Sequence, residues 1–140
     1  LIHAAQRGLD VRLQVCGNFT DLPAVRYAGQ IYYAQLLRAG VRVFEYQPRF
    51  SHLKSALVDQ WVTLGSCNFD HWTLHWNLEA NQAALDPALV EAVQHCFEQD
   101  FSQSTELTRQ AWLQLPVHYR LKIWFWGRVK RLADLFLSFY

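Results

Sequence analysis

The sequence predicts an α/β fold: a mixed, mostly parallel sheet flanked by helices, with an amphipathic helix at the C-terminal end. Two observations predict the sheet. Strand-like, helix-like and strand-like segments follow one another over residues 11–46, and two β-prone runs, 55–59 and 61–64, are separated by almost nothing. Helix-start residues and helical periodicity come next, which predicts helices after the sheet. The chain has 140 residues, 51% of them apolar, the size and mixture of one globular domain.

The first part of the chain predicts a βαβ crossover. Residues 1–8 are predicted to be helical and 11–15 to form a strand. An apolar stripe at helical spacing then predicts one helix, which ends where Gly40 provides a left-handed cap. A second strand is expected at 41–46, and this order favours parallel pairing. The helical stripe consists of Val25, Ala28, Gly29, Tyr32, Leu36 and Ala39.

The middle of the chain predicts a hairpin, one more strand and a helix. The two β-prone runs predict a tight turn at Asp59 and Gln60. Residues 77–85 are expected to supply a further strand. Asp86 followed by proline is a favourable helix start, an N-cap acid before a proline at the first helical position. The buried face of that helix is predicted to comprise Leu89, Val93, Cys96 and Phe97.

Charge and aromatic residues coincide at the C-terminal end. Residues 116–140 carry five of the 13 Lys and Arg side chains and seven of the 21 aromatic ones. We therefore expect two parts, a lobe at 1–115 that lacks its N-terminal portion, and a basic aromatic tail at 116–140. On a helix, the tail either packs on the core or lies in an anionic membrane surface. The residues expected to bind the membrane are Trp124, Phe125, Arg128, Lys130 and Arg131.

The cysteines do not indicate a disulfide framework, because there are three and no two are spaced as Cys-x-x-Cys. No apolar run approaches the roughly 20 residues that a membrane-spanning helix needs. Cys67, His71 and His75 are four residues apart and could imitate metal ligands on a helix, but no fourth ligand is obvious. Packing in a core or pocket wall is the favoured interpretation, and no metal is expected.

The residues between 52 and 79 carry the chemistry. If residues 53–58 are extended, His52 and Lys54 project from the same face of a strand. A hairpin that returns alongside them would add the hydroxyl of Ser66, the amide of Asn68 and a glycine that permits close approach of the backbone. An imidazole, an ammonium and such donors together suit a phosphate. A hydrolase triad of Ser66 with His52 and Asp59 is disfavoured, since no Gly-x-Ser-x-Gly elbow is present.

This order of residues resembles the signature of the phospholipase D superfamily, His-x-Lys, then Asp, then Gly-Ser-x-Asn, with a trailing acid. The resemblance implies one lobe of a phospholipase D-like fold and metal-free, cofactor-free phosphoryl transfer through a phosphohistidine. By this resemblance, Lys54 and Asn68 bind phosphate with help from Ser66. Glu79 then holds the distal ring nitrogen of His52. Asp59 organises the site.

The wider similarity, through 36–46, 65–70 and 77–81, is to the C-terminal half of bacterial cardiolipin synthases. It implies a phosphatidyltransferase that joins two phosphatidylglycerol molecules and works at the cytoplasmic face of the bacterial inner membrane. This chain would supply one of two such motifs, and an upstream lobe or a second copy the other. Phospholipid hydrolysis, nucleic-acid cleavage and a non-catalytic membrane module remain alternatives. No nucleic-acid partner is expected, because the basic residues cluster in the aromatic tail.

One spacing departs from the superfamily pattern. Five residues, 60–64, separate Asp59 from Gly65, where the superfamily usually has six. A shift of one residue along a strand reverses which face each side chain occupies. We expect the hairpin turn to absorb the difference. His52 is either the nucleophile or the acid–base group, and the resemblance favours the acid–base role for a C-terminal motif.

Overall fold

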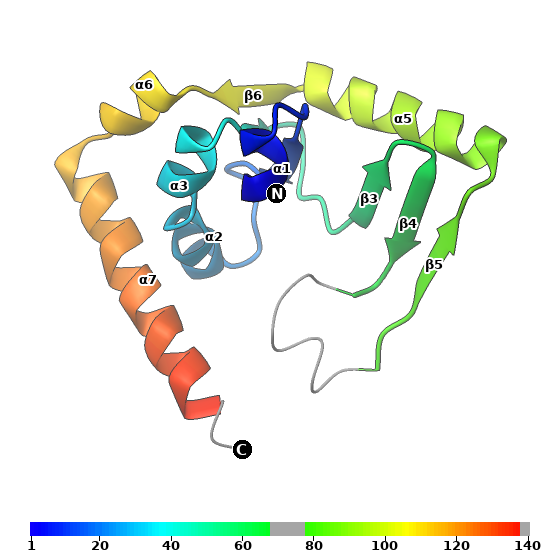
Figure 1. Ribbon diagram of the computed structural model, residues 1–140. Helices are drawn as coiled ribbons and strands as arrows, with labels where there is room; N and C mark the ends of the chain where they lie inside the picture. Colours follow the sequence, from blue (N-terminus) through cyan, green and yellow to red (C-terminus); the bar gives the residue numbers. More distant parts are fainter. Residues whose placement is uncertain (68–77, 138–140) are drawn as a thin grey trace. The chain divides into compact units, whose positions relative to one another are not determined.

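The computed structural model describes residues 1–67 and 78–137 and divides the chain into two compact units (Figure 1). The first unit comprises Leu1–Phe50 with Ser104–Tyr140, and the second comprises Ser51–Gln103. Each unit contains one three-stranded sheet. The expected α/β class, with helices flanking the sheets, is confirmed.

The first unit contains the predicted crossover. After α1 (Ile2–Gln6), strand β1 (Arg12–Cys16) pairs in parallel with β2 (Arg42–Tyr46). Strand β6 (Ser104–Leu107), which the sequence patterns did not suggest, pairs antiparallel with β2 on its other side. Helices α6 (Arg109–Leu113) and α7 (Val117–Leu137) complete the unit. The central strand is therefore the most buried, and Val43 has no solvent exposure.

The predicted helix between the first two strands is two helices, so that prediction is wrong in its continuity. Helix α2 (Pro23–Gln30) ends before Ile31, and α3 (Tyr33–Arg38) begins two residues later. The break places Tyr33, only 5% exposed, in the core. Its ring lies 5.3 Å from that of Trp112, and burial raises the pKa of its phenol. Tertiary packing of an aromatic ring therefore overrides the continuous helical stripe.

The second unit is a hairpin, a third strand and one long helix. Strands β3 (Lys54–Val58), β4 (Trp61–Gly65) and β5 (Asn81–Ala84) are paired antiparallel in sequence order. Helix α5 (Pro87–Ser102) packs on β3 and β4. As predicted, Asp86 caps it, with Oδ1 accepting from the backbone N–H of Leu89 at 2.8 Å. Of the predicted buried face, Val93 is buried, Leu89 and Phe97 are half-buried, and Cys96 is exposed.

The expectation of a mostly parallel sheet is wrong in one respect. Of the four described strand pairings, one is parallel and three are antiparallel. Strands β1 and β2 are joined through α2 and α3, which permits a parallel crossover, whereas a two-residue turn joins β3 to β4 and forces them to run in opposite directions. Within the described ranges, no helix has the length and hydropathy needed to span a membrane.

Helix α7 is held on the first unit by polar and steric contacts to α2. The Tyr119 hydroxyl accepts hydrogen bonds from Arg26 Nη1 at 2.8 Å and Gln30 Nε2 at 3.3 Å. Arg26 also pairs with the buried carboxylate of Glu45 on β2 at 2.8 Å. Burial is the largest single influence and lowers the pKa of Arg26, but Glu45 and Tyr119 together outweigh it, so the pKa is raised. The tail therefore forms a helix, one face of which packs against α2.

Candidate active site

The β3–β4 hairpin sets the geometry of the candidate site. Lys54 lies opposite Gly65, and Val58 lies opposite Trp61, with all five residue pairs in register and no bulge. Asp59 and Gln60 form the two-residue turn that the sequence predicts, and Asp59 has a φ of 51°, a left-handed value that Asp tolerates better than most residues. The hairpin therefore combines the short spacing between Asp59 and Gly65 with two regular strands and a two-residue turn.

Lys54 is the most distinctive residue of the hairpin, because it is a lysine with only 7% of its surface exposed. It begins β3, and its Nζ donates to the backbone carbonyl of His52 at 2.9 Å. An ammonium carries three N–H donors, and this bond uses one of them. A buried ammonium attracts anions more strongly than an exposed one, because less water screens it. Lys54 is therefore a buried cation that can attract an anion.

His52 lies just before β3, two residues outside the strand, with an exposed side chain. Regular pairing of the hairpin begins only at Lys54, and the expectation that His52 and Lys54 project from the same face stays a prediction. The two residues are joined by the bond from Lys54 Nζ to the His52 carbonyl. This bond fixes the backbone at His52 and leaves the imidazole accessible to a substrate.

Gly65 and Ser66 are locked to the segment that leads into β5. The Ser66 N–H donates to the Ala80 carbonyl at 3.1 Å, and the Ala80 N–H donates to the Ser66 hydroxyl at 3.2 Å. Asn81 adds a bond from the Cys67 N–H to its Oδ1 at 3.2 Å. A Cβ at Gly65 would collide with the Asn81 amide and the Ala80 carbonyl. Gly65 is therefore required by close backbone packing, and Asn81 is a positioning residue that the sequence patterns did not single out.

The remaining predicted site residues are not all brought together. Glu79 lies half-buried two residues before β5. Asp59 is exposed at the turn, and it lies five positions after Lys54, or about 17 Å of strand, so the two are at opposite ends of the hairpin. Asn68 and the two histidines of the metal-like spacing, His71 and His75, lie outside the described residues. Within the described ranges, no three metal-ligating side chains gather in one place.

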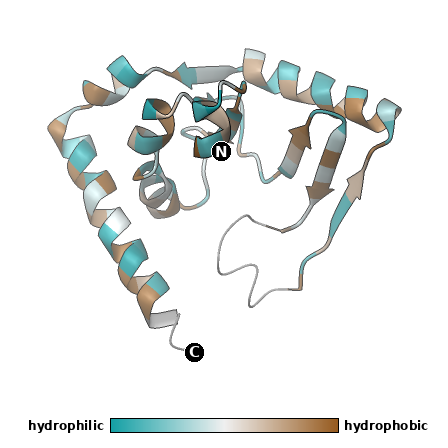
Figure 2. Ribbon diagram, viewed as in Figure 1, coloured by the Kyte–Doolittle hydropathy of each residue, from teal (hydrophilic) through white to brown (hydrophobic). Residues whose placement is uncertain are grey.

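The predicted membrane-binding residues lie on α7, where hydrophobic and hydrophilic residues are interspersed (Figure 2). Trp124 and Phe125 are 59% and 53% exposed. The guanidinium of Arg128 lies over the Trp124 ring, 5.3 Å from its centre. Lys130 pairs with Asp134 one turn later, and Arg131 is exposed. The helix thus presents aromatic rings and cations together on its outer surface.

Among its described residues, the second unit contains several groups that can contact an anion. A buried ammonium, an accessible imidazole and a hydroxyl on a tightly held backbone are the groups that nucleophilic and acid–base phosphoryl transfer uses. The chain superimposes on a phospholipase D family member, Nuc from Salmonella typhimurium, with a TM-score of 0.63. That match covers 77% of this chain and 70% of Nuc at 22% identity, and it establishes the fold.

Sequence comparison identifies the family to which the chain belongs. Residues 1–101 match the family described as cardiolipin synthase, PLD-like domain, so the chain belongs to this family of the phospholipase D superfamily. It is 36% identical over 108 residues to cardiolipin synthase A of Pseudomonas putida and 38% identical over 106 residues to that of Pseudomonas aeruginosa. These matches cover 76% and 75% of this chain, but only 22% and 21% of the two relatives. Helix α7 lies beyond the residues that match the family.

Proposed function

We propose that this chain supplies one of two His-Lys-Asp half-sites in a phosphatidyltransferase that makes cardiolipin and glycerol from two phosphatidylglycerol molecules. The observation that carries the proposal is the buried Lys54 ammonium, tied to the backbone of His52 inside the region that matches the cardiolipin synthase family. The other half-site comes from an upstream lobe or from a second copy of the chain. The relatives, of which this chain spans about a fifth, support this substrate class by their names.

The chemistry proceeds by two displacements at phosphorus. In the first, an imidazole nitrogen of one half-site attacks the phosphorus of phosphatidylglycerol, the P–O bond to the glycerol headgroup breaks, and the departing oxygen takes a proton from the other imidazole. In the second, a hydroxyl of another phosphatidylglycerol gives its proton to that imidazole and attacks phosphorus, and the N–P bond breaks. His52 is assigned the acid–base role, and Lys54 balances the phosphate charge.

The other predicted residues act around this step. Ser66, whose hydroxyl is held by the Ala80 N–H, and Asn68 contribute hydrogen bonds to phosphate oxygens. Glu79 orients the ring of His52, since a carboxylate on one ring nitrogen fixes which nitrogen reacts. Asp59, at the far turn, maintains the hairpin that places Lys54 opposite Gly65. No cofactor takes part.

The enzyme is proposed to work as a peripheral protein at the cytoplasmic face of the bacterial inner membrane. Exposed aromatic and apolar residues on α7, including Trp124 and Phe125, lie beside basic residues such as Arg131. Each basic side chain near an anionic surface contributes about 1 kcal/mol to binding, and apolar insertion adds to it. The tail at 116–140 would therefore hold the protein where its lipid substrate resides.

The test is to incubate the full protein with phosphatidylglycerol vesicles and to identify the lipid products by mass spectrometry. We expect cardiolipin and glycerol, and loss of both in His52→Ala. The control is His95→Ala, which removes an exposed imidazole from α5. Phosphatidic acid in place of cardiolipin would move the assignment to a phospholipid hydrolase. Full activity of His52→Ala would contradict the site, and no product from wild type would favour a non-catalytic membrane module.

A further inference from the structure

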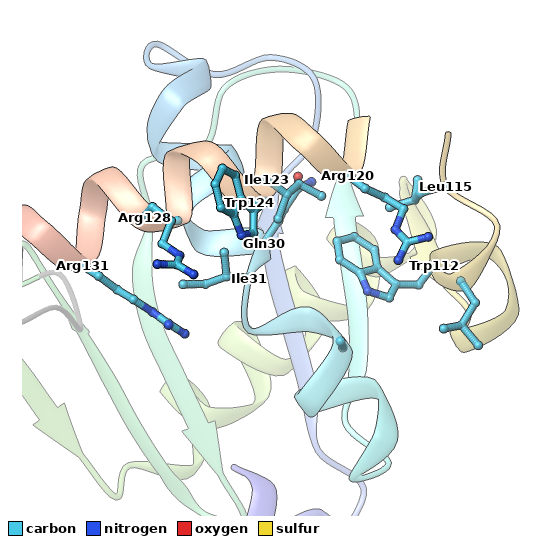
Figure 3. Close-up of a pocket in the computed structure, with 12 residues that line it drawn as sticks. Gln30, Ile31, Trp112, Leu115, Arg120, Ile123, Trp124, Arg128 and Arg131 are labelled. Carbon is cyan, nitrogen blue, oxygen red and sulfur yellow. The ribbon is translucent and has the colours of Figure 1, made fainter. Parts of the chain in front are cut away.

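A cavity of about 530 Å³ lies within the first unit, beneath α7, and none of the described residues assigned to catalysis lines it (Figure 3). One wall comes from the junction of α2 and α3, including Ile31 and Ala34. A second comes from α6 and the residues after it, including Trp112. The third is α7 itself. The cavity has the volume of a small-molecule site, and its walls combine apolar and aromatic groups with a few polar ones.

The polar groups of this cavity are mainly cations. Arg120, Arg128 and Arg131 line it, all from one face of α7. Among the described residues, none of these three guanidinium groups forms an ion pair with a carboxylate, whereas Lys130 on the same helix pairs with Asp134. Three arginines without acidic partners around one cavity create a positive potential that favours an anionic ligand.

The arginines divide between the two ends of the cavity. In Figure 3, Arg128 and Arg131 extend toward the end near Ile31, and Arg120 extends toward Trp112. Arg128 and Arg131 are three residues apart, about one helical turn, whereas eight residues, or about 12 Å of helix, separate Arg120 from Arg128. The Trp124 ring supports the Arg128 guanidinium from one side. A planar guanidinium held in this way keeps its N–H edge directed at an oxyanion.

The cavity also borders an exposed apolar stripe. Trp124 belongs to both, since it lines the cavity and is 59% exposed. At helical spacing, Leu121, Leu132 and Leu135 continue the stripe on the side of Trp124 that faces away from α2, and they are 60%, 56% and 57% exposed. A ligand with its charge in the cavity could therefore lay an apolar chain along α7. Free phosphate would use the arginines but none of the apolar surface.

We propose that this cavity binds the phosphate headgroup of one anionic phospholipid, with Arg128 and Arg131 on the phosphate and the acyl chains along the apolar stripe of α7. The site is separate from the residues assigned to catalysis and goes beyond the proposed function, because it binds lipid without turning it over. It would fix the depth and orientation of the protein on the membrane, which electrostatic attraction alone leaves variable.

The test is calorimetric titration of the full chain with short-chain phosphatidylglycerol, kept below the concentration at which it forms micelles. The protein used carries His52→Ala and Lys54→Ala, so that the proposed half-site neither binds nor consumes the ligand. We expect saturable binding of one lipid per chain. Arg128→Gln with Arg131→Gln should weaken it at least about tenfold, because two charge-assisted contacts are lost. Arg38→Gln with Arg109→Gln removes the same charge from exposed positions outside the cavity and should leave affinity unchanged.

A second variant tests whether binding needs the space of the cavity as well as its charge. Ala34→Phe adds a ring to the cavity wall without changing any charge and should also weaken binding. Thermal unfolding of each variant verifies that it is folded. Equal weakening by both arginine pairs would overturn the proposal in favour of general electrostatic attraction. Equal affinity for inorganic phosphate would overturn the lipid assignment, and unaltered binding by folded Ala34→Phe would overturn the cavity.

Discussion

The β3–β4 hairpin and helix α7 differ in which side chains they bury and which they expose. In the hairpin, the charged group is hidden: Lys54 is 7% exposed and is tied to the backbone of its own segment. On α7, the apolar groups are displayed, and Trp124 and Leu121 are 59% and 60% exposed while Tyr119 anchors the opposite face. A buried charge suits a reaction that needs a fixed cation shielded from water. A displayed apolar surface serves contact with a lipid phase.

This contrast teaches where each kind of site originates. The hairpin site arises from residues close together in the sequence, so a short motif describes it. The α7 surface arises from long-range contacts, because Arg26 and Gln30 on α2 decide which face of α7 turns inward. We therefore expect the hairpin site to lose its function when a single side chain is replaced. The α7 surface should lose its function when its packing on α2 or its exposed residues change.

The largest effect is expected from Lys54→Ala, which tests the hidden charge. Loss of a preorganised cation beside a phosphate should lower turnover of phosphatidylglycerol by about 100-fold or more. The measurement is the initial rate of cardiolipin formation, with circular dichroism as the control for folding. Lys122→Ala removes an exposed lysine from α7 and provides the comparison. Equal rate losses in both variants would mean that Lys54 has no special role.

Next comes Arg26→Met, which tests the inner face of α7. It leaves the Glu45 carboxylate, 8% exposed, without its cation and removes a donor to Tyr119. We expect the free energy of unfolding in urea to fall by about 3 kcal/mol, because an unpaired buried charge is costly. Replacing both partners, Arg26→Met with Glu45→Gln, should recover part of that loss. A loss below about 1 kcal/mol in the single variant would argue against this anchor.

A smaller effect is expected from Leu121→Ser with Phe125→Ser, which tests the displayed face. Both side chains are more than half exposed, so stability should change little. Flotation with anionic vesicles should weaken roughly tenfold, since about 1.5 kcal/mol or more of transfer free energy is lost. Leu9→Ser with Val25→Ser, at 55% and 64% exposed positions that are not part of α7, is the matched control. If the control weakens flotation equally, exposed apolar residues promote vesicle binding wherever they lie on the protein, and α7 has no special role.

The smallest effect concerns the edge of the first sheet. Arg42 and Glu106 pair across β2 and β6 at 2.8 Å, and the Arg42 hydrogen bond lowers the Glu106 pKa below its ordinary 4.5. A lowered carboxyl pKa stabilises the fold above the ordinary value, and this contribution disappears as the pH falls through the lowered value. Glu106→Gln should therefore cost less than about 1 kcal/mol at pH 7 and nothing in strong acid. Urea unfolding at both pH values measures it, and a difference that grows in acid would reverse the sign.

Sequence patterns predicted the local features and missed those that depend on distant contacts. The turn at Asp59 and the cap at Asp86 follow from the preferences of single residues and are confirmed. The break after α2 and strand β6 were missed, because the packing of Tyr33 and the pairing with β2 decide them. Helical spacing identified the apolar residues of α7 but not which of them α2 covers.

The same limit applies to the candidate site. The motif identified Lys54 and Gly65, whose placement opposite each other follows from a regular hairpin. It did not identify Asn81, whose amide accepts from the Cys67 N–H, because an asparagine at the start of a strand has no distinctive pattern. The cavity beneath α7 was not predictable either, since three separate segments build it.

The most direct test of the contrast between the two regions uses one preparation of His52→Ala and two readouts on phosphatidylglycerol vesicles. Product analysis reports the hairpin chemistry, and flotation reports the surface of α7. We predict that cardiolipin formation is lost while flotation matches wild type, because the imidazole serves the reaction and α7 serves attachment. Retained cardiolipin formation, or loss of flotation together with activity, would contradict this division of roles.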